Sequence, residues 1–239
     1  MNLTKGKFGL FSLLLGVFIL CSIASIALGS VNIPFSSVVN YFLGKPIPAI
    51  QQQIIEAIRS PKLLTAILCG SGLAVSGLQM QTFFRNPLAG PSILGVTAGG
   101  SLGVAFLLLG FHGATTAHTI AILGVSESWL LVLSSILGSF LVMLLLMLIA
   151  NRVKDTVVLL VVGLMIANIT LAVVGLWQYF SNPEQIQDYL LWTFGSLSGV
   201  TQQQLPIFTS VVLLGLLISV FLSKPLDQLL MGETYAKTM

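Results

Sequence analysis

The sequence predicts an all-α fold, a polytopic bundle of transmembrane helices, and three observations lead to this prediction. The chain has 239 residues, of which 56% are hydrophobic and 7% are charged, whereas soluble domains carry roughly 25% charged residues. Its mean hydropathy is +1.01. The charged residues lie in short intervals, and most of the uncharged stretches between them approach the length of about 20 residues that crosses a bilayer as a helix.

Six uncharged stretches are interpreted as spans. They are Phe8–Ser30, Leu63–Phe83, Ile93–Phe111, Trp129–Ala150, Val157–Phe180 and Pro206–Leu222. Lys5 and Lys7 precede the first stretch, as in a secretory signal. The stretch is much longer than the apolar core of such signals, about 7–15 residues, so we interpret it as an uncleaved helix.

The loop charges predict an orientation with the N-terminus in the cytoplasm. Six spans and an inside start place seven basic residues inside (Lys5, Lys7, Arg85, Arg152, Lys154, Lys224, Lys237) and three outside (Lys45, Arg59, Lys62). This is the bias that the positive-inside rule requires. Loop charges of this kind also explain the net charge of +3, so a nucleic-acid partner is not predicted.

Two of the loops between spans are expected to contain short helices. The first outside loop, Val31–Lys62, holds Ser36–Leu43 and Ala49–Ile58, which resemble surface helices. Tyr189–Val200 follows a turn at Asn182-Pro183 and is apolar but too short to span. Such a piece is typical of a re-entrant or interfacial helix, which is tolerated at membrane depth when it is buried in protein or lines a cavity.

Small residues cluster in the second and third spans. The third span has Gly95, Gly99 and Gly103 at four-residue spacing, and such faces let helix backbones approach closely. We favour tight packing over a direct contact with a substrate.

The stretch from Arg59 to Phe106 carries the most specific motif in the chain. It reads RSPKLLTAILCGSGLAVSGLQMQTFFRNPLAGPSILGVTAGGSLGVAF and contains Ser76, Gly77, Gln81, Arg85, Asn86, Pro87, Leu88, Ala89, Gly90, Pro91, Leu94, Gly95 and Gly99 in a fixed order. This pattern strongly resembles the permeases of iron–siderophore and cobalamin ABC importers, the FecCD type. Val157–Gly163, the WTFG of Trp192–Gly195 and the tail Leu226–Met239 are similar to later parts of the same family.

The resemblance implies a single permease domain over residues 1–239 that is incomplete at its C-terminus. Family members have about ten membrane helices, and the six spans here match the first part. The chain then ends inside the segment that resembles the cytoplasmic coupling helix. We expect a chain of this length not to transport alone.

The resemblance also implies functional roles for particular residues. Arg59 and Lys62 would dock an extracytoplasmic substrate-binding protein, as basic residues at an exposed rim steer an acidic partner. Arg59 should matter more, because lysine lacks the planar fork of arginine. Gly232, Glu233 and Ala236 would couple the permease to ATP-binding cassette ATPase subunits. Without the resemblance, Arg59 and Lys62 would be interpreted as an interfacial anchor of the helix, and Glu233 as a solvated surface residue.

Polar groups in the fifth span are candidates for the translocation path. Asn168 and Thr170 lie within the span, where an unpaired amide is costly, and bonding between helices explains Asn168 equally well. Thr156 corresponds to the inner gate of family members. The turn from Asn86 to Pro91 is interpreted as mainly structural.

The predicted function is the permease subunit of an ABC importer for an iron–siderophore, haem or cobalamin chelate, as a homodimer with partner ATPases. The subunit itself is not an enzyme: no phosphate-binding loop or catalytic constellation occurs. No cofactor is implied, and His112 and His118 lack companions that would suggest a metal site.

A truncated remnant, an ATP-independent transporter and an intramembrane enzyme are the alternatives to the importer permease. The lack of ionisable residues within the spans argues against the ATP-independent transporter.

Overall fold

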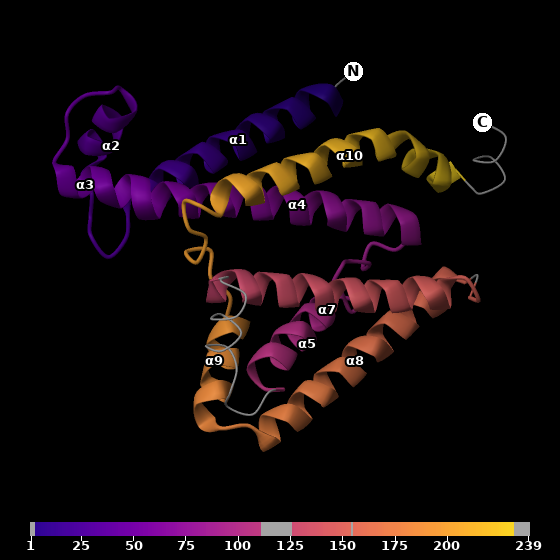
Figure 1. The fold of residues 1–239 in the computed structure, drawn as a ribbon. Coiled ribbons are helices and arrows are strands. Elements are labelled where there is room, and N and C mark those ends of the chain that lie inside the picture. The colour runs from indigo at the N-terminus through magenta and orange to yellow at the C-terminus, as the bar shows by residue number, and fades with distance from the viewer. Residues whose placement is uncertain (1–2, 111–125, 154, 232–239) are drawn as a thin grey trace. The chain divides into compact units, whose positions relative to one another are not determined.

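The computed structural model describes residues 3–110, 126–153 and 155–231, and all regular structure in these ranges is helical (Figure 1). The elements are α1 (Leu3–Ala27), α2 (Phe35–Phe42), α3 (Ala49–Ile54), the π-helical turn η1 (Ile55–Arg59), α4 (Ser60–Phe84), α5 (Val96–Leu108), α7 (Glu127–Ala150), α8 (Thr156–Phe180), α9 (Pro183–Thr193) and α10 (Leu205–Met231). The predicted all-α class is confirmed.

Five segments are long and apolar enough to cross a membrane. They are Lys7–Ala27, Ala49–Phe84, Glu127–Ala150, Thr156–Phe180 and Leu205–Leu230. Five of the six predicted spans therefore correspond to long helices, with bounds that differ by several residues at some ends.

The third predicted span, Ile93–Phe111, is shorter than expected. The helix in this region, α5, has 13 residues and is thus about 20 Å long, less than the roughly 30 Å of a hydrocarbon core. Gly95 precedes it with a φ of 77°, and a left-handed residue cannot continue a right-handed helix backwards. Ile93 and Leu94 consequently lie in a turn, and Phe111 lies outside the described residues.

The second span is longer than predicted, because α3, η1 and α4 form one apolar helical segment, Ala49–Phe84, of 36 residues. The sequence prediction separated a short helix, Ala49–Ile58, from a span that begins at Leu63, with Pro61 between them. Proline lacks a backbone N–H and crowds the turn before it. The wider turn of η1 directly precedes Ser60 and Pro61, and we attribute the continuity of the helix to this local π geometry.

The chain forms two compact units. The first comprises Met1–Gly72 with Leu197–Leu217. Its core consists of Ile26, Ile33, Val38 and Ile55, all buried, so the end of α1, the loop after it, α2 and η1 pack together. The two short helices predicted in this loop are confirmed as α2 and as α3 with η1.

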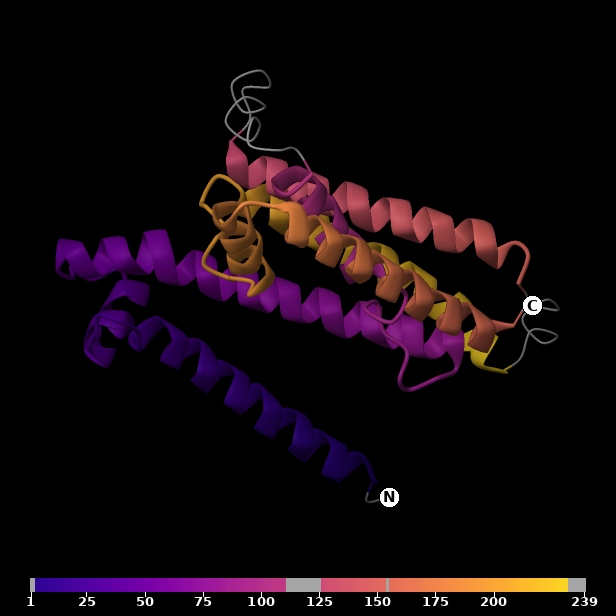
Figure 2. The same ribbon diagram turned by 90° about the horizontal axis from the view of Figure 1, so that it is seen from below.

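The second unit comprises Leu73–Ser196 with Ile218–Met239. In it α5 packs against α7, α8 and α9. Figures 1 and 2 show α7 and α8 diverging from the turn that joins them, with α5 between them. One core cluster lies near that turn, with Leu94, Leu146 and Leu159 among its members. The other lies toward α9, with Val104, Val174 and Tyr189 among its members.

The short helix expected over Tyr189–Val200 begins and ends earlier than predicted. Pro183 occupies the first turn of α9, and the backbone N–H of Asn182 donates to Oε1 of Gln185 at 3.3 Å. Proline at the first turn is favourable, since its missing N–H would be unpaired there anyway. Gly195, with a φ of 69°, follows the helix. The apolar run beginning at Tyr189 is therefore only the second half of α9 and the turn after it.

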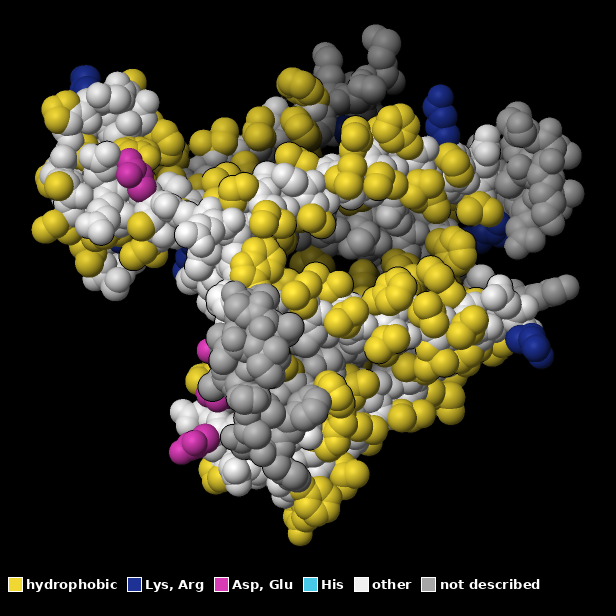
Figure 3. All heavy atoms as spheres, in the orientation of Figure 1, with side chains coloured by type: hydrophobic (Ala, Val, Ile, Leu, Met, Phe, Trp, Pro, Cys, Tyr) yellow, Lys and Arg dark blue, Asp and Glu magenta, His cyan; other side chains and the backbone are white. Residues whose placement is uncertain are grey.

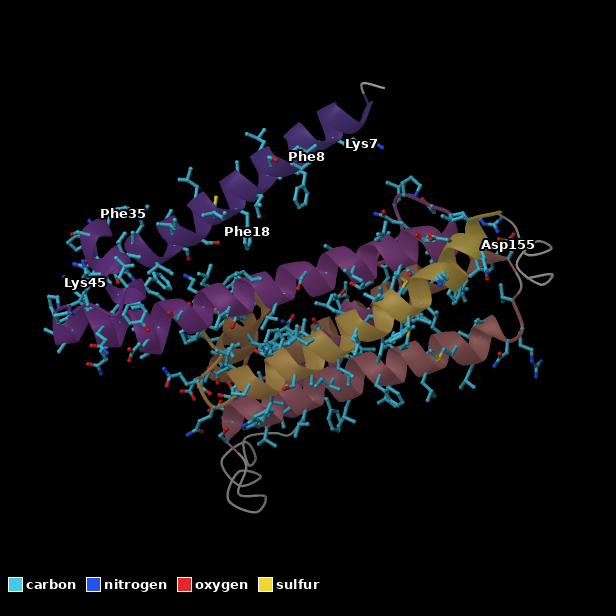
Figure 4. The ribbon with its side chains drawn as sticks, turned by 90° about the horizontal axis from the view of Figure 1, so that it is seen from above. Lys7, Phe8, Phe18, Phe35, Lys45 and Asp155 are labelled. Atoms are coloured by element: carbon cyan, nitrogen blue, oxygen red, sulfur yellow. The ribbon has the colours of Figure 1, made fainter. Side chains whose placement is uncertain are left out.

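The surface of the long helices is apolar. Phe8 and Phe18 project from α1 and are 72% and 48% exposed (Figure 4). On the face shown in Figure 3, hydrophobic side chains cover α7 and α10, whereas Lys, Arg, Asp and Glu gather near helix ends. Exposed apolar surface of this extent marks contact with lipid or protein rather than water.

Candidate functional site

The guanidinium of Arg59 binds the C-terminal end of α1. It donates hydrogen bonds to the backbone oxygens of Ile26 and Ala27, the latter at 2.9 Å, and to the oxygen of Val31 in the following loop. The last carbonyls of a helix have no partner within the helix, and a cation is favourable at this negative end of the helix dipole. Arg59 therefore caps α1 and closes the loop after it.

This placement differs from the exposed rim that the sequence predicted for Arg59. The residue is 6% exposed. Nη2 lies 2.9 Å from the position that a Cβ on Gly29 would take. The missing side chain at Gly29 thus gives the guanidinium its room. The sequence could not show this burial, because it depends on α1 ending some thirty residues earlier.

Lys62, the other residue expected to dock a binding protein, is exposed at the start of α4. Near it in the same unit, Nε2 of Gln202 donates to the backbone oxygen of Glu56 at 2.9 Å. Burial raises the pKa of Tyr41, and the negative charge of Glu56, with the hydrogen bond to it, raises it further. The uncharged phenol of Tyr41 is therefore the favoured form in this corner of the molecule.

The motif turn between α4 and α5 is organised by backbone hydrogen bonds. The N–H of Asn86 donates to the oxygen of Gln81 at 3.1 Å, and the N–H of Arg85 donates to that of Thr82 at 3.3 Å. This pair is the Schellman pattern of a helix C-terminus, in which the residue after the cap is left-handed. That residue is Arg85, with a φ of 47°.

The rest of the turn is fixed by Asn86 and by a buried alanine. Oδ1 of Asn86 accepts from the N–H of Leu88 at 2.9 Å, and the oxygen of Asn86 accepts from the N–H of Ala89 at 3.0 Å. Ala89 is buried among Phe84 and Leu94, while Leu88 is 78% exposed. Pro87 is exposed and Pro91 is half-buried. These contacts fit the structural role expected for the turn.

Glycines let α5 and the turn before it approach two neighbouring helices closely. A Cβ on Gly99 would lie 2.7 Å from the oxygen of Gly138, and one on Gly103 would lie 2.0 Å from the oxygen of Ser134. A Cβ on Gly163 of α8 would lie 2.9 Å from Cα of Leu94. Gly99 and Gly103 therefore form the packing face that their spacing predicts, whereas Gly95 belongs to the turn before it.

The small residues of α4 have fewer neighbours among the described residues. A Cβ on Gly70 or Gly77 would meet nothing within 4 Å, and one on Gly72 would meet only Val212 at 4.0 Å. Oγ of Ser76 donates to the oxygen of Leu73 within the same helix at 3.2 Å, and Gln81 is exposed. The described part of the chain thus leaves this stretch of α4 without the close packing expected for it.

The candidate path residues lie in different surroundings on α8. Asn168 is exposed, and its Nδ2 donates to the oxygen of Leu164 at 2.9 Å. Thr170 is buried, and its Oγ1 donates to the oxygen of Ile166 at 2.8 Å. Thr156 is exposed at the start of α8, where Oδ1 of Asp155 accepts from the N–H of Val157 at 2.8 Å (Figure 4). Of the three candidates, Thr156 and Asn168 are exposed and Thr170 is buried.

Several predicted residues lie outside the described part of the chain. These are the coupling residues Gly232, Glu233 and Ala236, and the histidines His112 and His118. In the described part, no group of three or more His, Cys, Asp or Glu side chains is placed to hold a metal ion.

Sequence reasoning missed Gly29, Gly138 and the side chain of Arg85, which donates to the backbone oxygen of Leu229. Gly138 had a readable signal. Ser134 and Gly138, and Ser135 and Ser139, are each four residues apart in the fourth span, which is the spacing of a close-packing face. No comparable signal in the sequence identifies the other two.

Long apolar helices, an apolar surface and glycine-mediated helix packing define an integral membrane protein of the polytopic helical class. Residues 17–239 match the model of the FecCD transport family. The chain belongs to this family.

Individual relatives agree with the family match. The vitamin B12 import system permease BtuC of Klebsiella pneumoniae is 35% identical over 198 residues, which are 82% of this chain and 56% of that protein. BtuC of Salmonella newport is 34% identical over 76% of this chain and 52% of its own length. The chain therefore spans little more than half the length of these curated relatives.

A solved structure shares the fold. It is described as "an inward-facing conformation of a putative metal-chelate type ABC transporter", with a TM-score of 0.76 and 30% identity over 98% of this chain and 67% of that one. The resemblance inferred from the motif between Arg59 and Phe106 is confirmed.

Proposed function

We propose that this chain is the membrane-spanning subunit of an ABC importer that moves a metal chelate across the cytoplasmic membrane. The match to the FecCD transport family over residues 17–239 carries the proposal. The spanning helices and the similarity to a metal-chelate type ABC transporter support it. The N-terminus lies in the cytoplasm in this proposal, and residues 1–239 belong to one permease domain.

The substrate is a bulky chelate of the ferric siderophore, haem or cobalamin class. The relatives named as vitamin B12 permeases support this class. The candidate spans have few charged side chains, so they offer little electrostatic means of selecting one chelate. Selection then rests largely with the extracytoplasmic substrate-binding protein.

Docking of that binding protein is assigned to the corner formed by the end of α1, α2 and the start of α4. Lys62 is exposed there and is the direct contact in this proposal. Arg59 is buried on the end of α1, so it contributes by holding the corner in shape. An exposed cation steers an acidic partner and fixes its register.

Energy comes from ATPase subunits that contact the segment holding Gly232, Glu233 and Ala236. Two permease copies face each other around one path, to which Thr156 and Asn168 contribute. Thr170 faces the protein interior and joins the path only if α8 shifts against its neighbours.

The first test is to extract the chain from its native membrane in a mild detergent and identify what co-purifies in stoichiometric amounts. A nucleotide-binding ATPase and a second permease copy support the proposal. Uptake of radiolabelled ferric siderophore, haem and cyanocobalamin by vesicles holding the complex then identifies the chelate.

Two results would contradict the proposal. If the chain purifies alone, a non-transporting remnant becomes the better account. ATP-independent uptake by the chain alone would instead indicate a secondary transporter.

A further inference from the structure

Arg85 adopts a backbone conformation that arginine rarely takes. With a φ of 47° it is the one non-glycine residue of positive φ in the described ranges. It fills the position after the end of α4 where glycine is usual. An L-residue in this region is disfavoured by roughly a factor of ten relative to the right-handed conformation. A strained residue at such a position suggests a role for its side chain.

The side chain of Arg85 reaches the backbone of α10. Its Nη2 donates a hydrogen bond to the backbone oxygen of Leu229, 144 residues further along the chain. The described part of α10 reaches Met231, so Leu229 lies close to its last described residue. A hydrogen bond from a charged guanidinium is stronger than one between neutral groups.

The turn that carries Arg85 rests on the core of its unit. Phe84 and Ala89, on either side of the turn, are buried with Leu94 of the α4–α5 connection, Leu146 of α7 and Leu159 of α8. A displacement of α7 or α8 therefore bears on this turn directly. Close-packed cores transmit such displacements rather than absorbing them.

Leu229 stands three residues before Gly232 in the sequence, and Gly232 opens the segment that the proposed function assigns to the ATPase. We propose that Arg85 is a positioning residue for ATPase coupling, which links the core of α5, α7 and α8 to α10 at Leu229. This inference rests on the proposed function.

The experiment uses the full transporter complex in lipid nanodiscs and proteoliposomes and compares Arg85→Gly, Arg85→Lys and Arg85→Ala. Glycine accepts the left-handed backbone and removes only the side chain, so Arg85→Gly should fold at least as well as Arg85→Ala. Arg152→Gly is the matched control, since Arg152 is another exposed arginine just after a spanning helix, α7.

Two measurements are made on each complex. Hydrogen exchange of the amides in residues 224–231 reports the contact itself. Chelate uptake per ATP hydrolysed reports coupling. We expect Arg85→Gly to speed the exchange and to lower uptake per ATP, each by about tenfold, as befits the loss of one hydrogen bond to a charged group. Arg85→Lys should recover part of both, and Arg152→Gly should match the wild type.

The outcomes separate the two proposals. A wild-type complex without an ATPase refutes the importer proposal and, with it, the coupling role of Arg85. A wild-type complex that hydrolyses ATP and imports chelate, with Arg85→Gly unchanged in exchange and in uptake per ATP, refutes this inference alone. Faster exchange with unchanged uptake per ATP also refutes it, because Arg85 would then only stabilise α10.

Discussion

Arg59 and Arg85 stand immediately before and after α4, and both donate to backbone carbonyls of another helix. Arg59 is buried and binds three oxygens in the region where α1 ends. Arg85 is exposed, binds one oxygen of α10 and holds a strained backbone. The same chemistry therefore serves two purposes. The buried contact is needed for the fold, whereas the exposed contact adds little stability and suits a moving connection.

The largest expected effect is the loss of the buried contact. Arg59→Met leaves three backbone oxygens without their charged donor in a buried corner, and we expect a loss on the order of 3 kcal/mol in the free energy of unfolding. Thermal unfolding of the purified protein in detergent should show a midpoint lower by about 6–12 °C.

Two further variants bracket the Arg59 prediction. Arg59→Lys keeps the charge but has no fork of donors, so its unfolding midpoint should fall between those of the wild type and Arg59→Met. Gly29→Leu should resemble Arg59→Met, because the added side chain would displace the guanidinium. If Arg59→Met unfolded at the same temperature as Lys62→Met, the structural role of Arg59 would be refuted.

The second effect concerns the close contact between α5 and α7, in the unit that also holds the Arg85 turn. Gly138→Ala places a Cβ 2.1 Å from the oxygen of Gly99, so α5 and α7 must separate. We expect a loss of about 1–3 kcal/mol, as for other overpacked cores. Gly175→Ala in α8 meets nothing within 4 Å and should be neutral or stabilising, because alanine is the better helix former by about 1 kcal/mol. Equal midpoints for the two variants in thermal unfolding would count against the close α5–α7 contact.

A smaller effect on stability is expected at Arg85, in contrast to Arg59. Arg85→Gly loses one exposed hydrogen bond and relieves the left-handed strain, and these changes offset each other to within about 1 kcal/mol. Arg85→Ala keeps the strain and should be less stable than Arg85→Gly by about 1 kcal/mol. The same unfolding assay measures both. A loss at Arg85→Gly as large as that at Arg59→Met would remove the distinction between the two arginines.

The fold class could be predicted from the sequence because a bilayer imposes long uncharged stretches. Phe8–Ser30 and Trp129–Ala150 were read from apolarity alone and correspond to α1 and α7. The length of α5 could not be read in this way. Gly95 is equally compatible with a packing face and with a left-handed turn, and only the surrounding backbone decides between them.

The candidate site was predictable to a smaller extent. The motif identified the turn from Asn86 to Pro91 and the family. The burial of Arg59 and the contact of Arg85 with Leu229 could not be predicted, because each depends on where a helix distant in the sequence lies. A basic residue beside a span is ordinarily interpreted as an exposed anchor, and this rule was wrong for the exposure of Arg59.

The smallest effect separates the two residues first paired as docking contacts. Lys62 is exposed, and an exposed ion pair contributes about 0.2–1 kcal/mol. Lys62→Glu should therefore weaken association of the binding protein by about two- to fivefold at low salt, and the difference should shrink at high salt, where exposed charges are screened.

Lys45→Glu, in the loop between α2 and α3, makes the same charge change at another exposed position of that unit and is the control. The affinity of the binding protein for the permease complex in nanodiscs measures both. If Lys45→Glu weakened binding as much as Lys62→Glu, the effect would be general electrostatic attraction by the unit. A difference confined to Lys62 would place the acidic partner at the start of α4, beside the corner that Arg59 holds in shape.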